Sequence, residues 1–201
     1  MDKYKEIEEL LMKYSHLGYK EVEYEDGTGA KLIGEAPFYG NNLPLNIIYT
    51  PISIIDIDKI EDLIGIKMPP SLQKFLNTFS NGLTFMLRAF QIYGKKHILS
   101  RKCFRWQPMD FMMSNVYERL KNAPKDAIFI GYYGYDASRV FMTSDETVHY
   151  CARWDATTLH TWSSLEEFLI SEIERIYELY NDKGERIVPG YPTSPMHLLD
   201  L

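Results

Sequence analysis

Apolar residues recur at helical spacing in three parts of this 201-residue chain. Positions i, i+3, i+4 and i+7 share one face of a helix, so each set predicts an amphipathic helix with one buried side. The predicted buried sides are Ile7, Leu10, Leu11 and Tyr14 in the first helix, Leu72, Phe75, Leu76 and Phe79 in the second, and Leu165, Phe168, Leu169, Ile173, Ile176 and Tyr180 in the last.

Capping residues set the expected ends of these helices. A short helix before the second one has Asp56 or Asp58 as its predicted N-cap, and Gly65 supplies a left-handed stop. The last helix opens at Ser163 with Ser-Ser-Leu-Glu, a capping box in which Glu166 occupies the third helical position. A further helix is predicted over 109–120.

Short apolar or alternating runs between Gly, Pro, Asn and Asp residues predict strands. They cover 22–24, 31–33, 45–49, 83–90, 127–133, 138–142 and 147–154. The last three are joined by short turns, which is typical of an antiparallel meander.

Charge and aromatic content narrow the class of partner. The chain has 28 acidic and 22 basic residues, a formal net charge of −6, which argues against nucleic acid as the main partner. A negative surface steers encounter with a basic partner. The 15 Tyr residues fit either a contact surface or a sheet-rich core.

Targeting signals and cysteine usage point to the cytoplasm. The first residues, MDKYKEIEELLMKY, alternate charged with apolar residues and lack the apolar centre of a signal peptide. No apolar run approaches the roughly 18 residues that span a membrane. Cys103 and Cys151 form no CxxC pair, which favours a reduced, intracellular chain.

The stretch at 60–83, IEDLIGIKMPPSLQKFLNTFSNGL, combines a short helix, a Gly, a Pro and an amphipathic helix ending at Asn-Gly. Together with AIFIGYYGYDASRVFM and SSLEEFL downstream, it resembles the SUKH superfamily, which contains fungal cell-wall assembly regulators and many bacterial immunity proteins. The resemblance covers about 54–180. It implies an α+β fold, in which a mixed, largely antiparallel sheet is flanked by helices, and it implies no enzyme activity and no cofactor.

This resemblance also divides the chain. Residues 1–53 are expected to form an N-terminal extension, a helix plus extra short strands, that packs on the main domain. The SUKH-like domain takes 54–180, and 181–201, with three Pro and two Gly, form a C-terminal tail.

Reactive side chains offer weak candidates for chemistry. His149 and Cys151 share one face of a predicted strand and His160 follows, but a structural His and a buried thiol are favoured over zinc, so no metal is predicted. Cys103 lies in the basic and aromatic run RKCFRW, where a surface thiol is favoured over a nucleophile or a nucleic-acid platform. Alternating acidic residues Glu21, Glu23 and Glu25 predict a solvated strand edge, with a docking face as the alternative.

The turn after the central strand holds the candidate binding residues. Rigid Tyr rings beside a carboxylate suit a binding hot spot, and capping of the sheet core is the equal alternative. The predicted partner-binding residues are Tyr132, Tyr133, Tyr135 and Asp136, with Trp106, Trp154 and Asp155 bordering the same surface.

The resulting hypothesis is a non-enzymatic intracellular immunity protein. It would bind and neutralise a cognate toxin, a basic nuclease or deaminase domain, with no role for nucleic acid or membrane. A regulatory or scaffold module is the second hypothesis, and a small enzyme or ligand binder using the His149–Cys151 region is the third. The oligomeric state stays open.

Overall fold

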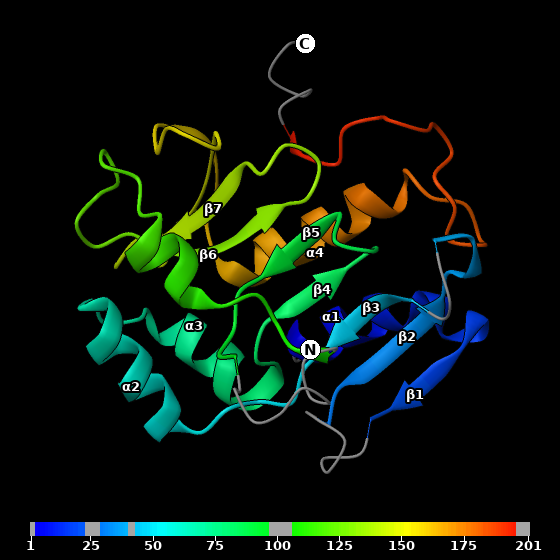
Figure 1. Cartoon of the computed structure of the whole chain (residues 1–201), viewed down its shortest axis with the longest axis horizontal. Coiled ribbons are helices and arrows are strands. Elements are labelled where there is room, and N and C mark those ends of the chain that lie inside the picture. Colours follow the sequence, from blue (N-terminus) through cyan, green and yellow to red (C-terminus); the bar gives the residue numbers. More distant parts are fainter. Residues whose placement is uncertain (1–2, 23–28, 40–42, 97–105, 196–201) are drawn as a thin grey trace.

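A computed structural model describes residues 3–22, 29–39, 43–96 and 106–195. Over these residues, nine strands form one sheet in which spatial order follows chain order and every neighbouring pair is antiparallel (Figure 1). The strands are β1 Tyr19–Glu21, β2 Lys31–Glu35, β3 Pro44–Ile48, β4 Leu83–Phe85, β5 Phe90–Ile92, β6 Ile128–Tyr133, β7 Arg139–Met142, β8 Val148–Cys151 and β9 Thr158–Trp162. An isolated parallel bridge joins Gly94 to Asp110. The predicted α+β fold with a largely antiparallel sheet is confirmed.

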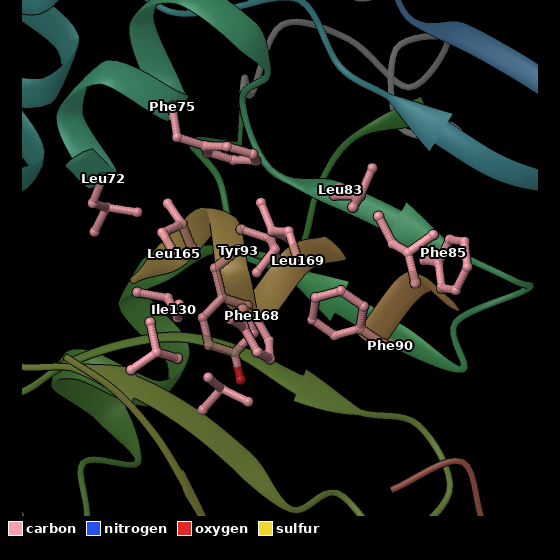
Figure 2. Close-up of a cluster of buried hydrophobic side chains, with 14 of the residues drawn as sticks. Leu72, Phe75, Leu83, Phe85, Phe90, Tyr93, Ile130, Leu165, Phe168 and Leu169 are labelled. Carbon is pink, nitrogen blue, oxygen red and sulfur yellow. The ribbon is translucent and has the colours of Figure 1, made fainter. Parts of the chain in front are cut away.

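Helices flank this sheet and bury its larger apolar cluster. They are α1 Lys3–Leu11, α2 Ile54–Ile64, α3 Pro70–Lys74 and α4 Leu165–Tyr177, with π-helical turns at Phe75–Phe79 and Met113–Tyr117 and short 3-10 segments at Met12–Leu17 and Pro37–Tyr39. Figure 1 shows α4 passing behind the central strands. Phe168 of α4 meets Phe90 of β5 edge to face, with ring centroids 5.3 Å apart, in the core that Figure 2 shows. None of the helices described is long and apolar enough to cross a bilayer.

The opposite face of the sheet carries a second row of side chains. Register places one residue from each of five successive strands side by side along this row: Leu32, Ile47, Thr84, Gln91 and Tyr132. At the Leu32–Ile47 end, the row is part of a smaller hydrophobic cluster. This cluster consists of the buried residues Ala30, Ile47 and Tyr49, with Leu32 and Trp106 packed against them. Because successive side chains of a strand point to opposite faces, the main core and this row share the same strands.

The N-caps of two helices differ by a residue or more from the predictions. Ser53 is the N-cap of α2, since its hydroxyl accepts from the Asp56 backbone N–H at 3.2 Å. Gly65 ends α2 at φ 72°, as predicted. The cap of α4 is Ser164 rather than Ser163, and the Glu167 carboxylate reaches back to the Ser163 backbone N–H at 2.8 Å. Adjacent serines and adjacent glutamates allow this shift of one position.

Two strand predictions are also corrected, and one strand was not predicted. The predicted strand 83–90 is a hairpin, β4 and β5, because its middle residues take left-handed backbone angles. Strand β9 was missed, since Thr158–Trp162 has four exposed positions and reads as polar. The first strand is Tyr19–Glu21 and precedes the predicted 22–24; positions 23 and 24 lie outside the described residues.

The first and last segments that the structure describes both pack on the central structure. Strands β1 to β3 extend the same sheet as the later strands, and the Tyr177 hydroxyl of α4 donates to the Leu10 carbonyl of α1 at 3.0 Å. Near the other end, Thr193 and Ser194 are buried. Described residues from both segments, among them Tyr39 and Thr193, line the surface described next.

Candidate partner-binding pocket

A cavity of about 930 Å³ opens on the sheet face that α4 does not cover. We call it the aromatic pocket. Its lining comes from strands β3 to β6, the segment after residue 105 and the C-terminal region: Tyr39, Leu43, Pro44, Ile47, Tyr49, Thr84, Met86, Leu87, Arg88, Ala89, Gln91, Trp106, Gln107, Met109, Tyr132, Gly134, Tyr135, Tyr180, Arg186 and Thr193. Ligand sites in proteins typically have volumes of about 300–1,000 Å³, so this one is of functional size.

One wall of the pocket is the strained turn between β4 and β5. Met86, Leu87 and Arg88 have φ of 43°, 54° and 75°. The left-handed region costs a residue with a Cβ about 1–2 kcal/mol, so the turn persists only because its neighbours hold it. The Met86 N–H donates to the Asn46 side-chain oxygen at 3.0 Å, and the Leu87 N–H donates to the Leu45 carbonyl at 2.9 Å.

Two other segments clamp the same turn. A Cβ on Gly134 would lie 2.1 Å from the Arg88 carbonyl oxygen, so only glycine permits this approach of the β6–β7 turn. The Thr193 hydroxyl donates to the Ala89 carbonyl at 3.1 Å, and the Arg175 guanidinium of α4 donates to the Thr193 carbonyl at 2.6 Å. The pocket wall is therefore fixed from the sheet, from α4 and from the C-terminal segment.

A chain of polar side chains forms part of the floor. The Tyr132 hydroxyl donates to the Gln91 side-chain oxygen at 2.5 Å, and the Gln91 amide donates to the Thr84 hydroxyl at 2.8 Å. The Tyr49 hydroxyl lies 2.9 Å from the same Thr84 oxygen. Burial raises the pKa of Tyr49 to about 12, and the nearby Arg88 charge opposes this only in part. Tyr49 therefore stays a neutral hydrogen-bonding group at physiological pH.

Three of the residues predicted to bind a partner meet in this pocket. Tyr132, Tyr135 and Trp106 all line it. Tyr135 is 52% exposed at the rim, whereas Tyr132 is half-buried because its ring stacks near Tyr93, with centroids 5.8 Å apart. Their role in binding stays a prediction.

The neighbouring candidates have internal partners. Tyr133 faces α4, is fully buried, and its hydroxyl donates to the Glu172 carboxylate at 2.6 Å. A group so placed does not reach a partner, which corrects its inclusion in the contact surface. The Asp136 carboxylate accepts from the Ser138 hydroxyl at 2.6 Å and from the Ser194 hydroxyl at 2.7 Å, so it ties the turn to the C-terminal segment.

Trp154 and Asp155 lie between β8 and β9, at the same end of the sheet as the Tyr132–Tyr135 turn, but they do not line the pocket. Trp154 is 73% exposed, with the Arg153 guanidinium over its ring at 4.3 Å. Asp155 accepts from the Asn122 side-chain amide at 2.7 Å. The two residues are exposed, and their binding to a partner stays a prediction.

The sequence pattern does not reveal most of the pocket. Arg88 lies in a run that alternates like one continuous strand, and Tyr49 ends a predicted strand that carries no functional signal. Arg186 and Thr193 lie in the predicted tail. No spacing rule joins these residues, because their segments are far apart in the chain.

His149, Cys151 and His160 make contacts within the protein. Both ring nitrogens of His149 lie against threonine hydroxyls, of Thr143 at 3.0 Å and Thr158 at 3.1 Å, and burial lowers the pKa of this His. Burial raises the pKa of the Cys151 thiol to about 12. His160 meets Trp162 edge to face. Within the described ranges, no three His, Cys, Asp or Glu residues form a metal-sized group.

The remaining candidates are settled only in part. Cys103, Glu23 and Glu25 lie outside the described residues. Glu21 is on β1 at the edge of the sheet and accepts from the Tyr19 hydroxyl at 2.5 Å.

The fold and the pocket define an α+β domain that presents a concave aromatic surface on one antiparallel sheet. The family model for the SMI1 / KNR4 family (SUKH-1) matches residues 51–171, more than half of the chain. The chain belongs to this family, as the resemblance predicted. No curated protein and no solved structure matches it.

Proposed function

We propose that the chain is a non-enzymatic immunity protein that binds a cognate bacterial toxin through the aromatic pocket and thereby neutralises it. The pocket itself carries the proposal, because it gathers Tyr, Trp and Arg side chains, which are the residue types that dominate binding hot spots. Membership in the SMI1 / KNR4 family supports an interaction module in general.

Binding at this surface needs little reorganisation. The floor residues are on paired strands, and the β4–β5 turn is hydrogen-bonded to three other segments. A surface that is already ordered loses little conformational entropy on binding. Exposed Tyr39, Leu43, Met109 and Tyr135 extend the apolar area around the opening. A standard interface covers roughly 800 Å² of each partner, and covering a toxin's active site inhibits it without chemistry.

The toxin is a nuclease or deaminase domain with a basic surface, and the encounter takes place in the cytoplasm. The formal net charge of −6 supports a basic partner, because opposite net charges speed association. Trp154 and Asp155, at the same end of the sheet, add contacts at the edge of the interface. Each of these finer statements depends on the identity of the partner.

Co-expression tests the proposal. The full chain is produced together with each toxin encoded by a neighbouring gene, and growth rescue and affinity by calorimetry are measured. We expect one toxin to be neutralised, and we expect Tyr135→Ala and Trp106→Ala to weaken its binding at least tenfold. Tyr117→Ala is the matched control, because Tyr117 is 72% exposed and does not line the pocket.

Each outcome has a distinct meaning. If no toxin is bound or neutralised, the immunity role is wrong. If a toxin is neutralised but the pocket variants bind it as tightly as the control does, the role stands and the location is wrong.

A further inference from the structure

Among the residues that the structure describes, the lining of the aromatic pocket is positively charged, whereas the chain as a whole is negative. This described lining contains Arg88 and Arg186 and no carboxylate, although the chain has a formal net charge of −6. At physiological ionic strength the Debye length is about 8 Å, so groups at the pocket, rather than net charge, set the field that an inserted group meets. Low-dielectric walls concentrate that field.

Arg88 is placed to use its charge on a ligand. It is exposed on the strained turn, and its guanidinium has no ion pair or hydrogen bond with another residue that the structure describes. It lines the same cavity as Tyr49 and Tyr132, whose hydroxyls belong to the polar floor. Backbone strain persists at positions where it serves a function. Here the strained turn presents an unpaired arginine to a cavity, which indicates that the arginine binds a ligand.

The floor adds hydrogen-bond donors. In the chain from Tyr132 through Gln91 and Thr84 to Tyr49, the shared Thr84 oxygen leaves one hydroxyl hydrogen of the Thr84–Tyr49 pair unused. The Gln91 amide also keeps a second hydrogen. Guanidinium and neutral donors together suit a carboxylate, which only accepts.

The walls require an apolar group as well. Trp106, Ile47 and Tyr180 border the cavity, and the rim residues Tyr39 and Tyr135 are 54% and 52% exposed. A small anion in the pocket would leave these rim rings in water. A segment of a protein covers the pocket and the rim together.

We propose that the partner protein inserts a segment with an Asp or Glu side chain beside an aromatic or aliphatic one, and that Arg88 binds the carboxylate. This inference depends on the proposed protein-binding function, which it makes more specific. A toxin that is basic overall can carry such a segment, because net charge acts on encounter while the inserted carboxylate acts on the bound state.

Peptide selection on the immobilised full chain tests this inference without knowledge of the toxin. Random peptides of about twelve residues are selected from a phage-displayed library. We expect the enriched peptides to contain Asp or Glu within two positions of an apolar residue. The affinity of the best peptide and of its Asn or Gln analogue is then measured by calorimetry with the wild type, with Arg88→Gln and with Arg153→Gln. Arg153 is an exposed control outside the pocket.

The peptide carboxylate and Arg88 should be coupled. Replacing the peptide carboxylate by an amide should weaken binding to the wild type and to Arg153→Gln about tenfold, which corresponds to about 1.4 kcal/mol. It should weaken binding to Arg88→Gln by less than about threefold. Enriched peptides without acidic residues, or an equal effect of the amide on all three proteins, would overturn the inference. The inference would also be overturned if no peptide were enriched and the pocket bound a small free anion such as ATP instead.

These outcomes separate the inference from the proposed function. A chain that binds acidic peptides through Arg88 but neutralises no toxin keeps the inference and loses the immunity role. A chain that neutralises a toxin but shows no coupling at Arg88 keeps the role and loses the inference.

Discussion

Asn46 is the side chain whose loss should disturb the pocket most. It is fully buried on β3. Its amide donates to the Leu11 carbonyl at 2.8 Å and to the Tyr177 hydroxyl at 3.0 Å, and its oxygen accepts from the Met86 N–H at 3.0 Å. Three net hydrogen bonds contribute about 1 kcal/mol each, and the orphaned Met86 N–H adds to the loss. We expect Asn46→Ala to lower the free energy of unfolding by at least about 3 kcal/mol.

Urea unfolding followed by circular dichroism measures this change, with Asn77→Ala as the matched control. Asn77 is partly buried, and its amide makes a single hydrogen bond, to the Ile52 carbonyl at 2.7 Å. We expect the control to lose about 1 kcal/mol. For a chain of this size, Asn46→Ala should lower Tm by roughly 6–12 °C. A loss for Asn46→Ala no greater than that of the control would refute the view that one amide holds the strained turn in place.

Other predictions concern the supports of the pocket and the buried thiol. Arg175→Met should lower the free energy of unfolding, measured by urea titration, by about 3 kcal/mol. It leaves the Glu172 carboxylate buried without the guanidinium that donates to both carboxylate oxygens in the native chain. An unchanged free energy of unfolding would contradict this reasoning. Gly134→Ala should lower it by about 1–3 kcal/mol, because the new Cβ meets the Arg88 carbonyl; an unchanged urea midpoint would show that the turn can move. With the other cysteine replaced by Ser, Cys151 should react with iodoacetamide at pH 8 roughly a thousandfold more slowly than a free thiol. The reason is that burial raises the pKa of this thiol from 9.0 to about 12 and so reduces the thiolate fraction. Reaction as fast as that of the unfolded chain would argue against this burial.

Local patterns sufficed where one element decides its own structure. The helix at 165–177 follows from its apolar stripe, and the end of α2 follows from Gly65, because the left-handed position there disfavours a Cβ. The meander of β6 to β8 also follows from short turns between apolar runs. Where two neighbouring residues offer similar caps, as Ser163 and Ser164 do, the pattern fixes the helix and leaves its first residue open.

Alternation failed where backbone angles departed from the ordinary regions. Residues 83–90 read as one strand, and nothing in Met86, Leu87 or Arg88 favours positive φ. Hydrogen bonds from Asn46 and Thr193, about 40 and 100 positions away in the chain, impose the turn. Tyr132 and Tyr133 show the same limit, because alternation separates their faces but does not say which face α4 covers.

The sequence by itself determined the family, the α+β class and most of the helices and strands, because each depends on residues close together in the chain. The tertiary structure alone decided the pocket and its charge, since Arg88 and Arg186 belong to segments about a hundred residues apart that only the folded sheet brings to one cavity. A site built from distant segments has no local sequence signature. Its charge can be opposite to the net charge of the chain, because screening by salt limits the range over which each charge acts.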